Sequence, residues 1–283
     1  MTNETVPPAR TAFERDGHYG PVPVLSAREV EYYRGRLEDF ERRYPDDRRK
    51  IKTKAHMLCP WVDAIARHPR ILDAFEEIIG PDILCYSMAF RVKEPDRRTF
   101  AGWHQDSAYL RIRPTVVLAA LALSPCSVEQ GCLAVIPGTH KGPVLPHAES
   151  ADEDSILARG QSIAAELDTN RAVDLALKPG ELAFFHFNAV HGSRPNLSND
   201  RRIMLLVEMM PTSARQADGR ESAMLVRGVD RYGHFERDRP AEIECGTTER
   251  AAWQEAVSLR AKTLFDGSEL RVSEAYGGAA RSA

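Results

Sequence analysis

Hydrophobic positions in the first eighty residues follow the spacing of amphipathic helices. The segment Ser-Ala-Arg-Glu at residues 26–29 has the form of a capping box. The apolar residues behind it are separated by three, four and three positions, which predicts a helix with one buried face: Val30, Tyr33, Leu37 and Phe40. Two shorter helices are predicted over residues 61–67 and 69–80. Residues 1–24 are Pro-rich and polar, and predict a loose lead-in with no more than one short strand.

From residue 83 the pattern changes to short apolar runs separated by turn residues, which is typical of β-strands. Such runs cover residues 116–123, 173–177, 203–207 and 223–229. Residues 141–171 hold few apolar runs and many acidic residues. They predict a long insertion over a pocket mouth, with a short helix near residues 155–159. A final helix is predicted after Thr248 as its cap, with one face formed by Trp253, Val257, Arg260 and Leu264.

These elements predict a mainly β fold with flanking helices (α+β). A helical lead-in covers about residues 26–80, a β core about 83–230, and a C-terminal helix about 248–265. A chain of 283 residues could form one large or two small domains, and a β-rich barrel of this length is commonly one domain. We therefore expect a single domain over residues 1–283.

A candidate metal site begins with His104 and Asp106. On a strand, alternation would send both side chains to one face and Gln105 to the other. His191, which ends a distant apolar run, is the third candidate ligand. Two imidazoles and one carboxylate on one face leave coordination positions open, which suits ferrous iron in non-haem oxygenases. The residue types alone suit manganese, zinc or nickel equally well.

Several motifs in one order carry a family resemblance. They are Trp-His-Gln-Asp at residues 103–106, the Gly-Cys to His segment at 131–140, Pro-Gly-Glu at 179–181, and His-Gly-Ser at 191–193 followed by Arg202. Over roughly residues 83–211 the chain resembles the phytanoyl-CoA dioxygenase-like (PhyH) family of Fe(II)- and 2-oxoglutarate-dependent oxygenases. The resemblance implies a double-stranded β-helix, a cupin-like jelly roll. It also implies Fe(II), 2-oxoglutarate and O2, with release of succinate and CO2 as an unactivated C–H of a small molecule is oxidised.

The resemblance also assigns residues to the cosubstrate. The family places an arginine eleven residues after the distal His, which is Arg202 here, and its planar fork suits a carboxylate. Strand alternation sends Arg201 to the opposite, solvated face. Ser193 and Thr115 are candidates to hydrogen-bond the cosubstrate, or are simple polar lining. Family members that halogenate carry Ala or Gly in place of Asp106, so hydroxylation or a related oxidation is favoured here.

Composition excludes several other functions. The net charge of −3 gives no reason to expect a nucleic acid or an anionic membrane as partner, and no apolar stretch is long enough to cross a bilayer. The N-terminus lacks the features of a secretory signal, and five scattered cysteines form neither a disulfide framework nor a zinc ribbon. We therefore expect a cytoplasmic protein. Its oligomeric state is not indicated.

Other histidines receive structural interpretations. We expect His140 in a structural turn, His186 packed or hydrogen-bonded, and His18, His68 and His147 at the surface, while His234 is a possible pocket residue. Residues 52–56 are either a solvated loop or a substrate lid. The predicted pocket lining is basic and aromatic and would suit an anionic or ring-bearing molecule: Arg111, Arg113, Tyr109, His56, Trp61, Arg227 and Tyr232.

The substrate class implied by the resemblance is a natural-product or amino-acid-like metabolite, free or tethered to a carrier. Two alternatives remain. One is a redox-silent isomerase or hydrolase that uses the same three ligands without Arg202. The other is a barrel that binds a small acid without turnover.

Overall fold

A computed structural model describes residues 9–150 and 152–265, and two antiparallel sheets form its centre. The larger sheet has seven strands, in the order β1 (His18–Pro23), β10 (Glu181–His186), β5 (Val117–Ala122), β12 (Arg202–Pro211), β2 (Ile83–Lys93), β14 (Ser222–Arg227) and β15 (Glu236–Arg237). The smaller sheet has four, in the order β3 (Ala101–His104), β11 (His191–Ser193), β6 (Leu133–Val135) and β9 (Val173–Leu175). Only β14 and β15 pair in parallel among these strands. The expected mainly β jelly roll is confirmed.

An apolar layer fills the space between the two sheets. Because side chains alternate along a strand, Leu118 and Ala120 of β5 and Leu206 of β12 point inward, where they join Leu133 and Val135 of the smaller sheet. The candidate metal site lies at one end of this interior.

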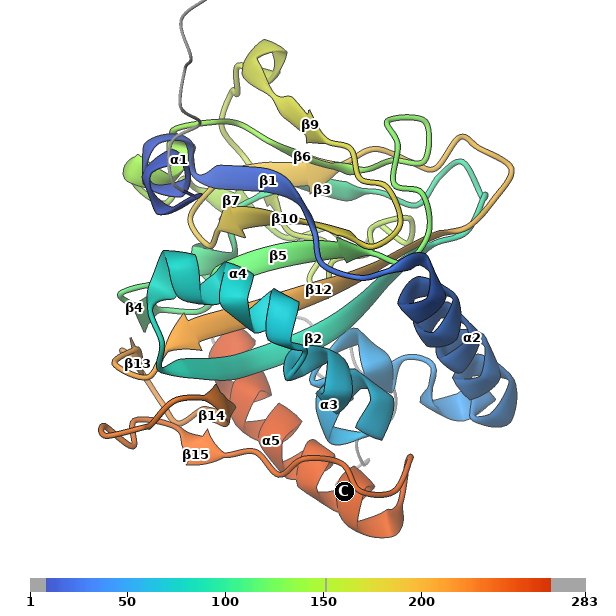
Figure 1. The fold of residues 1–283 in the computed structure, drawn as a ribbon. Coiled ribbons are helices and arrows are strands. Elements are labelled where there is room, and N and C mark those ends of the chain that lie inside the picture. The colour runs from blue at the N-terminus through green and yellow to red at the C-terminus, as the bar shows by residue number, and fades with distance from the viewer. Residues whose placement is uncertain (1–8, 151, 266–283) are drawn as a thin grey trace, which may run out of the picture.

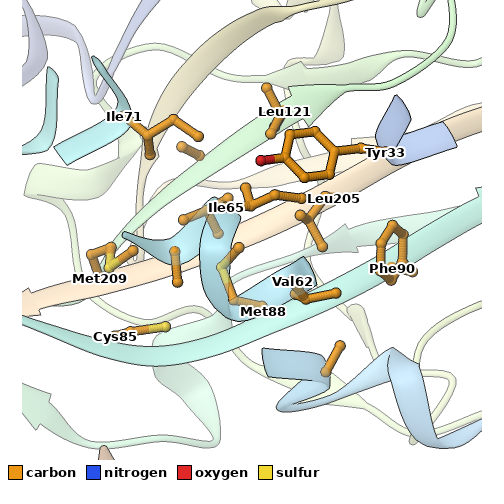
Figure 2. Packing of buried hydrophobic residues seen from close by; sticks show 14 of the residues in the cluster. Tyr33, Val62, Ile65, Ile71, Cys85, Met88, Phe90, Leu121, Leu205 and Met209 are labelled. Atoms are coloured by element: carbon orange, nitrogen blue, oxygen red, sulfur yellow. The ribbon is translucent and has the colours of Figure 1, made fainter. Parts of the chain in front are cut away.

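The outer face of the larger sheet is covered by the helices α2 (Ala27–Arg43), α3 (Pro60–Ala66) and α4 (Pro69–Ile79). The helix α5 (Thr247–Leu264) joins the same apolar layer through Trp253 and Val257, but its end joins the interior layer through Ala261 and Leu264. Figure 1 shows α4 and α3 lying across β5, β12 and β2. Figure 2 shows the contact itself, in which Val62, Ile65 and Ile71 of the helices pack on strand residues such as Leu121 and Leu205. The helices thus hold the sheet from outside, and the interior face remains for the site.

The start and buried face of α2 agree with the sequence pattern. Ser26 accepts a hydrogen bond from the backbone of Glu29, and the Glu29 carboxylate accepts one from the backbone of Ser26 at 2.7 Å. The predicted stripe is the set of buried residues in this helix: Val30, Tyr33, Leu37 and Phe40. The capping box is confirmed.

The one short strand expected in the lead-in is present as β1, but a helix also forms there, and residues 9–23 are not loose. Helix α1 (Ala9–Asp16) buries Phe13, and β1 pairs with β10 at the edge of the larger sheet. Pro21 and Pro23 lie in β1, and an edge strand tolerates proline because one side of it needs no ladder hydrogen bonds. Residues 1–8 lie outside the described part of the chain.

Two predicted helix features are also wrong. The N-cap of α5 is Gly246 and not Thr248, because the Glu249 carboxylate turns back to accept the backbone N–H groups of Glu242 and Ile243. No helix forms at residues 155–159. Instead Phe100 exchanges backbone hydrogen bonds with Asp154 and Ile156, which holds this segment extended. The insertion also contains a small hairpin of β7 (His147–Ala148) and β8 (Ser162–Ile163).

Residues 53–56 are buried, so a solvated loop is the wrong interpretation for them. They follow the 3-10 turn η2 (Lys50–Lys52) and run into a second one, η3 (Ala55–Met57). The Lys54 ammonium donates to Asp238 at 2.5 Å and to the carbonyl oxygens of Tyr86 and Ser222. A buried cation with three acceptors holds this segment firmly against β2.

Glycine is required at the turn before β6. Gly131 has φ +65°, and a Cβ there would lie 2.2 Å from the Arg194 carbonyl oxygen. The Gly-Cys motif therefore brings β6 close to the end of β11. A further hairpin joins β4 (Ile112–Arg113) and β13 (Arg215–Gln216). Within the described residues, no helix is long and apolar enough to span a membrane.

Candidate metal centre

Strand register brings the two histidines together. β11 pairs with β3 so that His191 lies directly opposite His104, and their ring centroids are 4.1 Å apart. Directly opposed residues on antiparallel strands share a face, so both imidazoles point into the same space.

Asp106 joins them from the end of the same strand. β3 ends at His104, but Gln105 keeps an extended backbone (φ −125°, ψ 123°), so alternation still sends Asp106 to the side of His104. The chain then turns into η4 (Asp106–Ala108). The Asp106 carboxylate lies 3.6 Å from the Nε2 atom of His104 and 3.6 Å from that of His191. One ligand atom from each residue lies within 4.8 Å of the others.

Backbone contacts orient both imidazole rings. The Nδ1–H of His104 donates to the Gly102 carbonyl at 2.8 Å, and that of His191 donates to the Ala189 carbonyl at 2.9 Å. Each ring therefore presents the lone pair of Nε2 to the shared space, as a metal ligand requires. Burial, followed by the nearby His104, lowers the pKa of His191 to about 4, so this ring is neutral at physiological pH.

The carboxylate has the charge that a cation needs. Burial alone would raise the pKa of Asp106, but His104 and His191 together hold that pKa well below its usual range. Two imidazoles and one anionic carboxylate form a donor set for a divalent transition metal with open positions.

Residues that brace this centre were not found from the sequence. Gln105 points away from the metal ligands and is buried; its amide donates to the Asn188 carbonyl at 2.9 Å and accepts from the Leu145 backbone at 2.8 Å. Asn188 also accepts from the Ser107 hydroxyl at 2.5 Å. These bonds tie the loop before His191 to the segment around Asp106. Alternation predicted the direction of Gln105, but its partners lie about 40 and 80 residues away.

The surface positions expected for two histidines are wrong. His147 accepts a hydrogen bond from the Gln105 backbone at 3.0 Å and packs on Tyr109, so it supports the centre. His68 is largely buried against Glu29 at 3.0 Å. His18 is partly buried on β1. His140 lies in the turn η5 (Thr139–Lys141), and His186 packs on Phe13, as expected.

Arg202 and Arg201 point to opposite faces of β12, as alternation predicts. Arg201 forms ion pairs with Glu41 and Glu94, each at 2.8 Å. Arg202 is fully buried on the inward face, and among the described residues its Nε and Nη2 atoms have no hydrogen-bond partner. Its Nη1 donates to the Met204 sulfur at 3.7 Å. Burial lowers the pKa of Arg202, because it disfavours the charged form of the guanidinium.

Lys93 connects Arg202 to the metal centre. It is the partner of Arg202 in the β12–β2 register, and its ammonium donates to the Ser193 hydroxyl at 2.8 Å. It also donates to the Arg194 carbonyl. Burial, followed by the charge of Arg202, lowers the pKa of Lys93 to about 7. Lys93 therefore joins the end of β12 that carries Arg202 to Ser193, two residues beyond His191 on β11.

Thr115 is placed differently from Ser193. Its hydroxyl donates to the neighbouring Val116 carbonyl at 3.0 Å, and the residue does not line the cavity described below. Its proposed contact with the cosubstrate remains a prediction.

A cavity of about 690 Å³ opens from Asp106. The insertion lines one wall, while β2, β12, the turn η2 and the end of α5 line the others. Arg159 of the insertion donates to the Leu264 carbonyl at 2.7 Å and lies over the Tyr109 ring, so insertion and terminal helix close the same side.

Of the predicted substrate-pocket residues, only Tyr109 lines this cavity. His56 and Trp61 are buried in the helix-covered region. Arg227 pairs with Asp73 and Glu76 outside the sheet, and the remaining predicted residues lie elsewhere on the molecule: Arg111, Arg113, Tyr232 and His234.

Two imidazoles and a carboxylate that converge inside a jelly roll define a non-haem metalloenzyme site. The nearby buried arginine has the charge to hold the carboxylate of a bound ligand. The sequence matches the phytanoyl-CoA dioxygenase (PhyH) family over residues 13–204. The chain belongs to that family, which its motifs had predicted.

Named relatives agree with this membership. The chain is similar to the peroxisomal phytanoyl-CoA dioxygenase of Bos taurus, with 34% identity over 139 residues, covering 47% of this chain and 41% of the relative. It is also similar to a probable alpha-ketoglutarate-dependent hypophosphite dioxygenase of Stutzerimonas stutzeri, with 28% identity and coverage of 54% of each chain. The matched part is thus about two fifths to one half of these relatives' lengths.

A solved structure resembles nearly the whole fold. The apo form of ThoJ, a non-heme monooxygenase, superimposes with a TM-score of 0.82 at 27% identity, covering 91% of this chain and 98% of that one.

Proposed function

We propose that this protein is an Fe(II)- and 2-oxoglutarate-dependent dioxygenase that oxidises an unactivated C–H of a small molecule. The observation that carries the proposal is the convergence of His104, Asp106 and His191 beside a buried arginine, Arg202, whose Nε and Nη2 have no partner. A buried guanidinium without an anion is costly unless the site takes up a carboxylate in its working state. The second carboxylate of 2-oxoglutarate has the required charge and shape.

The proposed roles follow from the geometry of these side chains. His104 and His191 would bind the metal through Nε2, because backbone carbonyls hold their Nδ1–H groups. Asp106 would bind as an anion. When bound, iron and 2-oxoglutarate would supply the oxidant: 2-oxoglutarate loses CO2 to give succinate, and the two atoms of O2 go to succinate and to the substrate.

Arg202 would orient the cosubstrate through two parallel hydrogen bonds to its far carboxylate. Lys93 would add a second positive charge and hold the Ser193 hydroxyl, which can then donate its own proton to the same carboxylate. The apolar side chains of Phe187 and Leu206 line the cavity near Asp106 and would keep bulk water from the reacting C–H.

The first experiment titrates Fe(II) and 2-oxoglutarate into the protein without air. We expect a visible charge-transfer band, and its loss in Asp106→Ala. Under air, the protein should form succinate with a suitable substrate, and Asp106→Ala should form essentially none. Normal product formation by Asp106→Ala would show that the carboxylate ligand is misassigned.

The two alternatives have distinct outcomes in the same assays. A redox-silent isomerase or hydrolase would give no band and would be unaffected by Arg202→Ala. A barrel that only binds a small acid would release no succinate under air. Comparing free substrates with carrier-bound forms in the succinate assay tests the tethered substrate that the family resemblance also allows.

A cytoplasmic location is part of the proposal. Its support is that all five cysteines are free and buried, as a protein of a reducing compartment would keep them. Purification of the native protein from fractionated cells tests it.

A further inference from the structure

Three cationic side chains line one wall of the cavity that reaches Asp106: Arg49, Lys52 and Arg91. Arg91 lies on the inward face of β2, opposite Met204 of β12. Its Nη1 donates to the Lys52 carbonyl at 2.7 Å, which fixes the turn η2 beside the strand. The three positive charges therefore lie on neighbouring segments that line the same cavity.

Two of these cations have no anion of their own. In the described part of the chain, no carboxylate lies within ion-pair distance of Arg49 or Lys52, both of which are exposed at the cavity mouth. The other arginines of the cavity are paired: Arg159 with Glu149, and Arg260 with Glu208 at 3.0 Å.

A polar atom beside these cations also lacks a partner. Thr53 lines the cavity and is only 3% exposed, yet its hydroxyl makes no hydrogen bond within the described parts of the chain. The Trp253 indole N–H donates to the Thr53 carbonyl at 3.0 Å and holds the residue in place. A buried hydroxyl without a partner is unusual and suggests that a ligand group completes it.

We propose that Arg49, Lys52, Thr53 and Arg91 form a subsite for an anionic group of the substrate, a carboxylate or a phosphate monoester. With the acid held on this wall, the C–H to be oxidised would face the metal centre. That the bound anion is a substrate rests on the proposed oxygenase function. The binding of an anion at these residues does not depend on it. Asp152 and Glu153 also line the cavity, on the exposed insertion. Their negative charges would disfavour an anion bound against the insertion.

The volume of the cavity agrees with such a ligand. About 690 Å³ lies within the range of pockets that enclose a small organic molecule. A guanidinium, an ammonium and a hydroxyl together offer donors to all oxygens of one acidic group.

The test measures binding without turnover. Protein loaded with stoichiometric Zn(II) and saturating 2-oxoglutarate is titrated calorimetrically with phenyl phosphate, benzoate and neutral benzamide. We expect at least one anion to bind more tightly than benzamide, and the preferred anion shows which acid the wall takes. Lys52→Met should weaken binding of that anion by at least about tenfold, because one charge-assisted hydrogen bond is lost. Arg49→Gln should act in the same direction.

The matched control is Arg111→Gln, which removes an equally exposed charge that pairs with Asp218 and lies outside the cavity. It should leave anion binding unchanged. The proposal is overturned if benzamide binds as well as both anions, if Lys52→Met binds them normally, or if the anions bind only when 2-oxoglutarate is omitted, which would place them at Arg202. Because zinc is redox-silent, these outcomes stand apart from the band and succinate assays that test the oxygenase itself.

Discussion

Replacing Arg202 with methionine should have opposite effects on stability and on cosubstrate binding. In the free protein, Arg202 is fully buried with Nε and Nη2 unpartnered, and an unsatisfied buried donor costs about 1–3 kcal/mol. Methionine is apolar and of similar length, and its flexible chain fills irregular space. Arg202→Met should therefore raise the free energy of unfolding of the free protein by about 1–3 kcal/mol.

The same change should remove the two parallel hydrogen bonds proposed for 2-oxoglutarate. At about 1.5 kcal/mol or more each, their loss amounts to about 3 kcal/mol, or on the order of 100-fold in affinity. Urea unfolding of the metal-free protein measures the first effect, and anaerobic titration of 2-oxoglutarate with Fe(II) measures the second.

Arg201→Met is the matched control, because Arg201 is the next residue of β12 and points outward to Glu41 and Glu94. It should lower the free energy of unfolding by about 1 kcal/mol and leave 2-oxoglutarate affinity intact. The reasoning is refuted if Arg202→Met destabilises the free protein as Arg201→Met does, or if it binds 2-oxoglutarate normally.

Three further predictions concern the ligands, the second cation and a turn. His191→Ala should lose more than about 100-fold in metal affinity by calorimetry, whereas His186→Ala, five residues earlier, should keep it; equal losses would contradict the ligand assignment. Burial and a nearby guanidinium lower the pKa of Lys93 to about 7, and a bound dianion would favour its protonated form. Affinity for 2-oxoglutarate should therefore fall as the pH rises above about 7, by up to about tenfold per pH unit, and Lys93→Met should flatten this dependence; parallel profiles would exclude Lys93 from the site. Gly131→Ala should destabilise the protein by at least about 2 kcal/mol in urea, because of its positive φ and the contact with a carbonyl oxygen. Gly35→Ala, in open space on α2, should instead stabilise it by about 0.5–1 kcal/mol; similar effects of the two changes would contradict this account.

Strand alternation predicted the side-chain directions in the candidate metal centre, because two of them depend only on the local backbone. The extended backbone of Gln105 preserves alternation between His104 and Asp106, although the strand ends before the pair is complete. The direction of Arg202 followed from the same rule. Motif order supplied the pairing of His104 with His191, which periodicity cannot supply.

The cavity lining could not be predicted in this way, because it depends on contacts between distant segments. Arg111 and Arg227 seemed suitable by charge, but each has an acid far along the chain that holds it outside. Two distant contacts hold Lys52 at the cavity: the Lys54 ammonium reaches Asp238, 184 residues later, and Arg91 of β2 donates to the Lys52 carbonyl. Sequence periodicity carries no information about such partners.

Substitutions in the terminal helix α5 can change which molecule the cavity accepts. All candidate residues for iron and 2-oxoglutarate precede Met204 and lie within the part of the chain that matches the family. Arg260 and Leu264 of α5 lie beyond the matched part of the chain, yet they line the cavity proposed to bind the substrate. Substitutions on this helix could therefore retune which molecule is accepted while the oxygen chemistry is inherited unchanged.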